Sequence, residues 1–250
     1  MEDCKRFIIL GCGRTGSNLL KTMLNSHPGM LCYGELFNMT DPSKISWSQE
    51  GMATEAVDTE LRRDDPCRFL EDRVFSGQPE GVAAVGFKLF YYHARKEGWD
   101  RVWSCLRSMR ELLVVHIRRR NQLRRLVSEK LANKTNKWSI SSESESHSEV
   151  TIRLDLRECI VAFKRVENWD REATNFFSSH RVHEVNYEGL LSNYEEESDR
   201  IQCFFGIPRA DLVPGTKRQV VQPLDEIIEN YDEICRGLAG TAWAEYLREA

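Results

Sequence analysis

A glycine-rich turn near the amino terminus carries the clearest chemistry in this sequence. An apolar run, Phe7 to Leu10, leads directly into the letters GCGRTGSN at positions 11–18. A strand that enters a helix through such a turn directs several backbone N–H groups and the positive end of the helix at one point. The segment therefore predicts a binding site for an anionic group such as the phosphates of a nucleotide.

Three classes of nucleotide-binding protein use this arrangement. The three glycines of the turn fit the GxGxxG pattern of dinucleotide-binding folds, and Glu35 falls where their ribose-binding acid is expected. An NAD(P)-dependent oxidoreductase is therefore one alternative. A nucleoside triphosphatase does not fit, because its loop requires Lys and then Ser or Thr where this chain has Ser and then Asn.

The third class binds a sulfuryl donor. The turn sets a cation, Arg14, before its last glycine and two hydrogen-bonding side chains after it. A fixed guanidinium, backbone N–H groups and side-chain donors suit the oxygens of a 5′-phosphosulfate. The predicted donor-binding residues of the turn are Gly13, Arg14, Thr15, Gly16, Ser17 and Asn18.

A second predicted strand also ends in positive charge. The apolar run Leu112–Ile117 is followed by arginines at 118, 119 and 120 and then by a helical pattern. Ligands of open α/β sheets bind at the carboxyl ends of strands, so a second anion site is one interpretation. A solvated basic surface is the other.

Together these residues resemble the PAPS-dependent sulfotransferases, where PAPS is 3′-phosphoadenosine 5′-phosphosulfate. The turn is similar to their (Arg/Lys)-(Ser/Thr)-Gly-(Ser/Thr)-(Thr/Asn) loop. Arg120 and Ser128 are similar to their 3′-phosphate site, in which a helical Ser follows the strand-end Arg after eight residues. The resemblance implies PAPS as co-substrate and no metal, with Arg118 a further candidate for binding the nucleotide.

Other stretches resemble the bacterial carbohydrate sulfotransferases of the trehalose sulfotransferase-like group, and the matches span Phe7 to Leu247. They are His27-Pro28 with Gly34–Phe37, Val85–Phe90 around Lys88, Tyr187–Leu190 with Gly189 in place of the usual Asp, Lys217-Arg218-Gln219, and Asn230–Glu233. The resemblance implies a small-molecule or glycan acceptor, a carbohydrate or glycolipid above all. It also implies nucleotide binding by Lys217 and Arg218.

The resemblance further implies an in-line displacement in which the positive charge of Arg14 stabilises the leaving phosphate. Glu35 is the expected base, His93 is the alternative base, and Lys88 is expected to point into the site. Trp47, Trp138 and the segment Met39–Glu60 are candidate acceptor walls. A nucleotide-binding module without activity is a further alternative.

The whole chain sets the frame for this site. It has 250 residues, 41% of them hydrophobic, a net charge of −4, and eight cysteines without a CxxC pair or zinc-ligand spacing. The length suits one domain, residues 1–250, and the negative charge argues against a general nucleic-acid binder. The cysteines favour a reducing compartment, the cytoplasm, and no apolar run is long enough for a transmembrane segment.

Apolar runs alternate with helical patterns along the chain, which predicts an α/β fold with a central, mostly parallel sheet flanked by helices on both faces and a P-loop-like strand-turn-helix site. Asn133–Val150 is predicted to be a mobile polar loop. The region Leu224–Leu247 fits either a homodimer surface or core packing. Strands are predicted at 7–10, 30–33, 82–90, 112–117 and 182–187, and helices at 17–24, 66–75, 121–131 and 153–177. The C-terminal third is predicted to be mostly helical, including a helix at 224–236.

Overall fold

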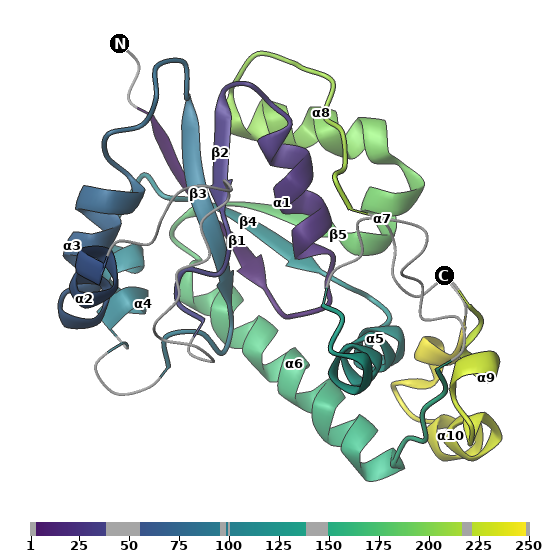
Figure 1. Cartoon of the computed structure of the whole chain (residues 1–250). Coiled ribbons are helices and arrows are strands. Elements are labelled where there is room, and N and C mark those ends of the chain that lie inside the picture. The colour runs from purple at the N-terminus through teal and green to yellow at the C-terminus, as the bar shows by residue number, and fades with distance from the viewer. Residues whose placement is uncertain are drawn as a thin grey trace.

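A five-stranded sheet forms the centre of the protein in the computed structural model, which describes residues 4–38, 56–95, 99, 101–138, 150–216 and 222–248. The strand order is β2-β3-β1-β4-β5, and every neighbouring pair is parallel (Figure 1). The strands are β1 (Lys5–Gly11), β2 (Met30–Tyr33), β3 (Ala84–Phe90), β4 (Leu113–Arg118) and β5 (Arg181–Asn186). The predicted parallel α/β sheet is confirmed.

Helices cover both faces of this sheet. They are α1 (Ser17–Asn25), α2 (Ala56–Asp64), α3 (Pro66–Phe69), the π-helical segment η1 (Leu70–Val74), α4 (Arg101–Ser108), α5 (Gln122–Thr135), α6 (Leu156–Phe176), α7 (Tyr187–Ser192), α8 (Tyr194–Phe205), α9 (Leu224–Ile227), α10 (Tyr231–Leu238) and the 3₁₀ segment η3 (Ala244–Leu247). Among these, α2 and α4 were not predicted from the sequence.

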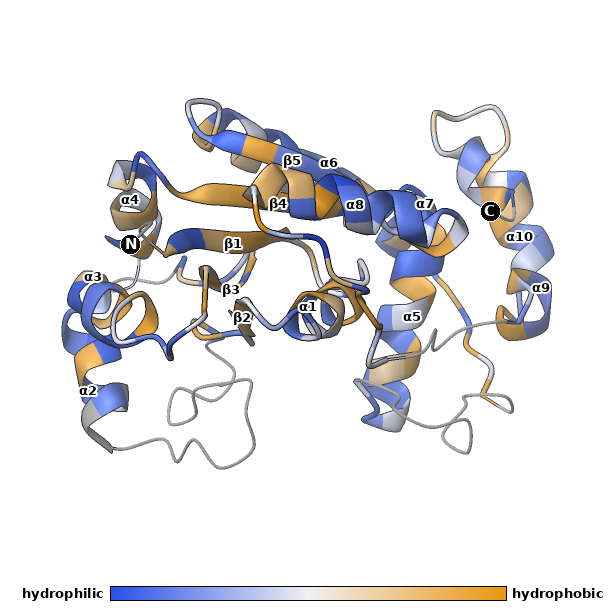
Figure 2. Cartoon of the chain, turned by 90° about the horizontal axis from the view of Figure 1, so that it is seen from above, coloured by the Kyte–Doolittle hydropathy of each residue, from blue (hydrophilic) through white to orange (hydrophobic). Residues whose placement is uncertain are grey.

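Side chains of the central strand alternate between two buried layers. Phe7 and Ile9 pack with α1, α7 and α8, whereas Ile8 and Leu10 pack with α3, α4 and the second half of α6. All four are essentially inaccessible to solvent, and burying one such side chain contributes roughly 1.5–3 kcal/mol. Figure 2 shows the strands as mainly hydrophobic between helices of mixed character. A strand buried on both faces gives the continuous apolar run seen in the sequence.

A third apolar cluster lies outside the sheet, where α9 and α10 pack on α5 and on the first half of α6 (Figure 1). Its members include Leu224, Ile234 and Leu238, which are buried. This part of the predicted helix-rich C-terminal region therefore packs into a core of the same chain.

The predicted single helix 224–236 is wrong, because α9 ends at Ile227 and an extended residue and a turn separate it from α10. Ile228 forms a parallel bridge with Ile152. The Asn230 side chain accepts a hydrogen bond from the Leu154 N–H at 3.0 Å and donates to the Leu154 carbonyl at 2.9 Å. These long-range contacts replace the helical hydrogen bonds that the local pattern predicts.

The start of α6 and the end of α5 each differ from the prediction by three or more residues. Helix α6 begins at Leu156 rather than 153, because the Asp155 carboxylate accepts from the Glu158 N–H at 2.9 Å and caps the helix there. Helix α5 continues to Thr135, so it includes the first residues of the predicted polar loop. Residues 139–149 of that loop lie outside the described residues.

Gly86 provides a test of the packing between β1 and β3. A Cβ atom at this position would lie 2.3 Å from the carbonyl oxygen of Phe7. We expect Gly86→Ala to lower the free energy of unfolding by about 1–3 kcal/mol, because the strands must separate to admit the methyl group. Urea denaturation of the full chain measures this change.

Gly189→Ala is the matched control, since the nearest atom to its added Cβ lies 3.9 Å away. Position 189 lies within α7, where Ala is favoured over Gly by roughly 0.5–1 kcal/mol. Equal stability of the Gly86→Ala variant and the native chain would contradict the close approach.

Candidate active site at the glycine-rich turn

The glycine-rich turn connects the end of β1 to the start of α1, and its glycines are required by close neighbours. Gly16 has a φ of 85°, which favours glycine, and an added Cβ would lie 2.3 Å from the ring of Tyr187. A Cβ on Gly13 would lie 2.8 Å from the hydroxyl oxygen of Tyr92. The turn is therefore held between one aromatic residue that follows β3 and another that follows β5.

The amino end of α1 is not capped by a side chain. Its N-cap residue is Gly16, and its first turn contains no acidic residue. An Asp or Asn side chain caps α3, α5 and α6, whereas α7, α8, α9 and α10 have no side-chain cap, as α1 has none. The Thr15 hydroxyl donates to the Cys12 carbonyl at 2.7 Å and so supports the turn from within. The N–H groups at the start of α1 suit an external anion.

Arg14 connects the glycine-rich turn with Ser128, one residue of the second predicted anion site. Its Nε donates to the Ser128 hydroxyl at 3.0 Å, and its Nη1 donates to the Trp138 carbonyl at 2.6 Å. Burial lowers the pKa of Arg14, yet a guanidinium keeps its charge at neutral pH. The glycine-rich turn and the middle of α5 therefore contribute polar groups to the same site. The Trp138 ring is exposed.

The junction of β4 and α5 differs from the glycine-rich turn, because a carboxylate of the same chain already accepts hydrogen bonds from its backbone N–H groups. The Glu188 carboxylate accepts from the Arg120 N–H at 3.0 Å and from the Asn121 N–H at 3.1 Å. The side chain of Arg120 is exposed. An anion at this junction would therefore be bound through side chains rather than through the backbone.

The side chains of Arg118 and Arg119, two of the three consecutive arginines, contact different partners. Arg118 forms ion pairs with Asp170 at 2.7 Å and Glu184 at 2.8 Å, so the structure does not bring it to Arg14. Arg119, which the sequence interpretation did not assign, is buried, donates to the Arg14 carbonyl at 3.3 Å, and lies 4.8 Å from the Tyr187 ring centre. Its position in the arginine run is the only signal that the sequence gives for it.

Lys88 joins the turn to the predicted base. It extends from β3, is 3% exposed, and donates to Asn18 at 2.5 Å and to Glu35 at 3.0 Å. Burial raises the pKa of Glu35, but Lys88 and His93 outweigh burial and the pKa is lowered overall. Asn38 also donates to the Glu35 carboxylate at 2.9 Å. Glu35 is therefore ionised at neutral pH.

His93 lies on the other side of Glu35 as a neutral ring. Its Nδ1 accepts from the Phe90 N–H at 3.2 Å, so the ring proton resides on Nε2. That Nε2 is buried, has no hydrogen-bond partner within the described part of the chain, and lies 3.7 Å from Glu35 Oε2. Burial lowers the pKa of His93 to about 4, although Glu35 acts in the opposite direction. The one ring nitrogen of His93 without a hydrogen bond, Nε2, therefore carries the proton.

Lys21 is a second lysine near this group that the sequence interpretation missed. It lies on α1, and its pKa is lowered by burial and then by the charge of Lys88, whereas Glu35 raises it. The sequence carried a signal for this residue, because Lys21 follows Ser17 by one helical turn and so shares its face of α1.

Lys217, Arg218 and Trp47 lie outside the described residues. The described chain reaches α1 just before Lys217, where the Gly215 N–H donates to Thr22 at 3.0 Å.

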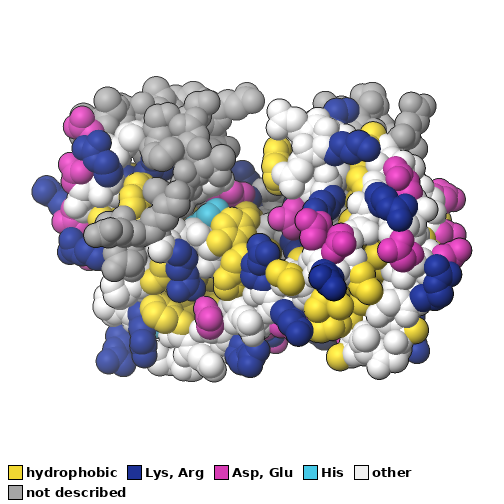
Figure 3. All heavy atoms as spheres, turned by 90° about the horizontal axis from the view of Figure 1, so that it is seen from below, with side chains coloured by type: hydrophobic (Ala, Val, Ile, Leu, Met, Phe, Trp, Pro, Cys, Tyr) yellow, Lys and Arg dark blue, Asp and Glu magenta, His cyan; other side chains and the backbone are white. Residues whose placement is uncertain are grey.

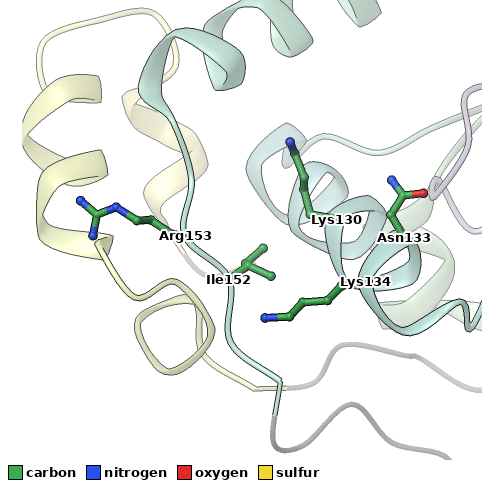
Figure 4. Close-up of a pocket in the computed structure, with 5 residues that line it drawn as sticks. All are labelled: Lys130, Asn133, Lys134, Ile152 and Arg153. Atoms are coloured by element: carbon green, nitrogen blue, oxygen red, sulfur yellow. The ribbon is translucent and has the colours of Figure 1, made fainter.

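Figure 3 shows the face seen from below, toward which β1 and β3 run in Figure 1, with hydrophobic side chains gathered around a histidine and lysines and arginines nearby. A separate hollow of about 450 Å³ lies on α5 and the chain before α6 (Figure 4). It is lined by Lys130, Asn133, Lys134, Ile152 and Arg153. Its three cations bind Glu158, the Thr151 carbonyl and Glu233, and it contains no predicted site residue.

Within the described ranges, no three His, Cys, Asp or Glu side chains are arranged to hold a metal ion. The eight cysteines are free. No described helix has the length and apolar character needed to cross a bilayer.

The fold is a parallel α/β sheet whose central strand enters a helix through a glycine-rich turn, with a carboxylate and a lysine beside that turn. Residues 6–211 match the sulfotransferase family, and the chain belongs to that family. This membership makes it a sulfotransferase and decides against the oxidoreductase alternative.

Similar proteins extend over almost the whole chain. Nodulation protein H from Rhizobium meliloti is 26% identical, with 98% of this chain and 95% of the relative covered, and that from Rhizobium tropici is 25% identical, with 96% and 92% covered. The crystal structure of a sulfotransferase from Alicyclobacillus acidocaldarius has a TM-score of 0.53 and 18% identity, covering 98% of this chain and 96% of the other. A sulfotransferase domain from the curacin biosynthetic pathway gives 0.50 and 15%, covering 98% and 83%. These two structures support the fold.

The protonation of His93 can be tested directly. Long-range ¹H–¹⁵N spectra of the full chain, assigned with a His93→Gln variant, should show the Nε2–H form and a titration midpoint near pH 4, since burial lowers the pKa to about 4. An unfolded His has a pKa near 6.5. The unfolded chain therefore takes up this proton first, and the group's contribution to stability is lost as the pH falls from about 6.5 to 4. An Nδ1–H form or a midpoint near 6.5 would contradict the assignment.

Proposed function

We propose that the protein transfers the sulfuryl group of PAPS to a hydroxyl group of a carbohydrate, with Glu35 as the base. The observation that carries the proposal is the position of Lys88, which bridges Asn18 of the glycine-rich turn and the Glu35 carboxylate. One cation thus connects the predicted donor loop with the predicted base. A sulfuryl transfer needs this proximity, because the acceptor oxygen must reach the sulfur while its proton leaves.

The 5′-phosphosulfate of the donor fits the turn. The amino end of α1 has no side-chain cap, so the N–H groups of its first turn are left for an external anion. Arg14 supplies a guanidinium whose present partners, the Ser128 hydroxyl and the Trp138 carbonyl, are neutral acceptors that an anion can replace. The predicted binding residues Ser17 and Asn18 start the helix at the same point.

The 3′-phosphate is assigned to Arg120 and Ser128. Glu188 already accepts from the two backbone N–H groups of that junction, which leaves side chains to bind the phosphate. Arg119 supports the neighbouring turn through the Arg14 carbonyl, and Arg118 is already paired with two carboxylates. Arg120, with its exposed side chain, is therefore the strongest of the three for this role.

The reaction is an in-line displacement at sulfur. The acceptor oxygen forms a bond to sulfur, the bond from sulfur to the bridging phosphate oxygen breaks, and 3′-phosphoadenosine 5′-phosphate leaves. The leaving phosphate gains negative charge, which Arg14, Lys88 and the N–H groups of the turn are suited to stabilise. The acceptor proton passes to Glu35, and the product is a sulfate ester.

Glu35 is preferred over His93 as the base. Glu35 is ionised at neutral pH, since Lys88 and His93 outweigh the effect of burial on its pKa. His93 Nδ1 already accepts from the Phe90 N–H, and its Nε2 carries the proton. A ring with no available lone pair is unable to take the acceptor proton, although it can donate toward Glu35.

The carbohydrate acceptor rests on the similarity to the trehalose sulfotransferase-like group at Gly34–Phe37 and Val85–Phe90. The free cysteines support the reducing, cytoplasmic location. A homodimer remains a prediction, since the buried residues of α9 and α10 pack within one chain.

Glu35→Gln should reduce turnover by about 100-fold or more, because general base catalysis contributes roughly 10²–10⁴-fold. The amide keeps the shape of the side chain and its contact with Lys88, so the affinity for 3′-phosphoadenosine 5′-phosphate should stay within about threefold. Transfer of ³⁵S from PAPS to a panel of sugars measures turnover, and calorimetry measures affinity. Unchanged turnover would refute the role of Glu35, and a chain with no nucleotide affinity would refute the proposed function.

Arg120→Ala should weaken the affinity for 3′-phosphoadenosine 5′-phosphate by about tenfold or more, because a hydrogen-bonded charge on phosphate contributes roughly 1.5–3 kcal/mol. Its affinity for adenosine 5′-phosphate, which lacks the 3′-phosphate, should change little. Arg153→Ala is the control, because that exposed arginine pairs with Glu233 far from the turn. Equal losses for both nucleotides would contradict a 3′-phosphate site at Arg120.

A further inference from the structure

Tyr92 has an orientation that neither the packing nor the reaction derived above explains. It follows β3 in the turn at residues 91–94, and 44% of its surface is exposed. Tyrosines at protein surfaces usually bury the ring and leave the hydroxyl in water. Here the hydroxyl lies over Gly13 in the glycine-rich turn, so close that a Cβ on Gly13 would lie 2.8 Å from it.

Three aromatic side chains hold the Tyr92 ring in place. Its centroid lies 5.7 Å from that of Phe90, 5.1 Å from that of His93 in an edge-on contact, and 5.6 Å from that of Trp169 on α6. The ring is thus a fixed surface beside the His93–Glu35 pair. An exposed aromatic ring that is rigidly supported binds ligand rings at little entropic cost.

The hydroxyl of Tyr92 is available to a ligand. Within the described residues it forms no hydrogen bond, and it lies over Gly13 of the glycine-rich turn. Burial raises the pKa of Tyr92 far above its ordinary value, and the Glu35 carboxylate acts in the same direction. The hydroxyl therefore remains protonated and able to donate at every physiological pH.

We propose that Tyr92 contacts both substrates: its hydroxyl donates a hydrogen bond to the sulfonate oxygens at the glycine-rich turn, and its exposed ring forms the platform on which the acceptor sugar stacks. The inference rests on the proposed function and names a residue that sets acceptor position. His93 contacts the Tyr92 ring and lies 3.7 Å from Glu35. A sugar stacked on this ring therefore has a hydroxyl within reach of both the Glu35 carboxylate and the sulfur atom. Lys88, which lies 5.3 Å from the Phe90 ring centre, borders the same surface.

Two substitutions separate the two roles. Tyr92→Phe keeps the ring and removes the hydroxyl, so kcat should fall about tenfold while the KM for the sugar stays within about twofold. Tyr92→Leu removes the ring as well, so the KM for the sugar should also rise about tenfold. Both variants should bind 3′-phosphoadenosine 5′-phosphate within about threefold of the native chain.

The assay follows ³⁵S transfer from PAPS to trehalose, maltotriose, cellotriose and chitotriose, and calorimetry follows the nucleotide. Val182→Ala is the matched control, because Val182 is 39% exposed but lies near the amino end of β5, at the opposite edge of the sheet. It should leave every parameter unchanged.

The outcomes distinguish this inference from the function on which it rests. Sugar transfer by the native chain with native kinetics in both Tyr92 variants would overturn the role of Tyr92 alone. A native chain that binds the nucleotide but sulfates none of the four sugars would overturn the sugar platform. A native chain that neither binds the nucleotide nor transfers sulfur would overturn the proposed function itself.

Discussion

The close approach of three chain segments at the glycine-rich turn is the constraint on which the site depends. Strand β1 lies between β3 and β4, so residues that follow β3 and β5 reach the turn at the carboxyl edge of the sheet. The hydroxyl of Tyr92 faces Gly13, and the ring of Tyr187 faces Gly16 at distances that admit no side chain. Arg119 then packs on Tyr187, and Glu188 fixes the adjacent junction. The turn is therefore shaped by its neighbours as much as by its own residues.

Much of the sheet could be predicted from the sequence, because each strand buried on both faces leaves a continuous apolar run. The second strand, Met30–Tyr33, was predicted with its observed bounds. The break between α9 and α10 was not, because it depends on Asn230 binding the backbone of Leu154, which lies 76 residues away in the sequence. A local helical pattern carries no information about a partner at that distance. Asn230 is one of the residues that carry the family resemblance, and in the structure its side chain links two distant chain segments.

The candidate site divides in the same way. The glycine-rich turn is local, so its form as a strand-turn-helix junction could be predicted from consecutive residues. The contacts among Asn18, Lys88 and Glu35 join three separate segments, and only the resemblance suggested them. The directions of Arg118 and Arg119 could not be predicted from a run of identical letters. Arg118 ends β4 and turns to carboxylates on α6 and β5, whereas the next residue turns to the glycine-rich turn.

The shared lysine has a consequence for the electrostatics of the site. Lys88 compensates Glu35 and also contacts the first turn of α1, where an anionic donor would bind. An anion that engaged Lys88 would withdraw part of the positive charge that now lowers the pKa of Glu35. The pKa of the carboxyl group would then rise, and the carboxylate would become a stronger proton acceptor when the donor is in place. His93 is neutral, bears its proton on Nε2 and lies 3.7 Å from Glu35 Oε2, so at neutral pH it adds no positive charge beside the carboxylate. In the proposed function, the strength of Glu35 as a base would therefore depend on the occupancy of the donor loop.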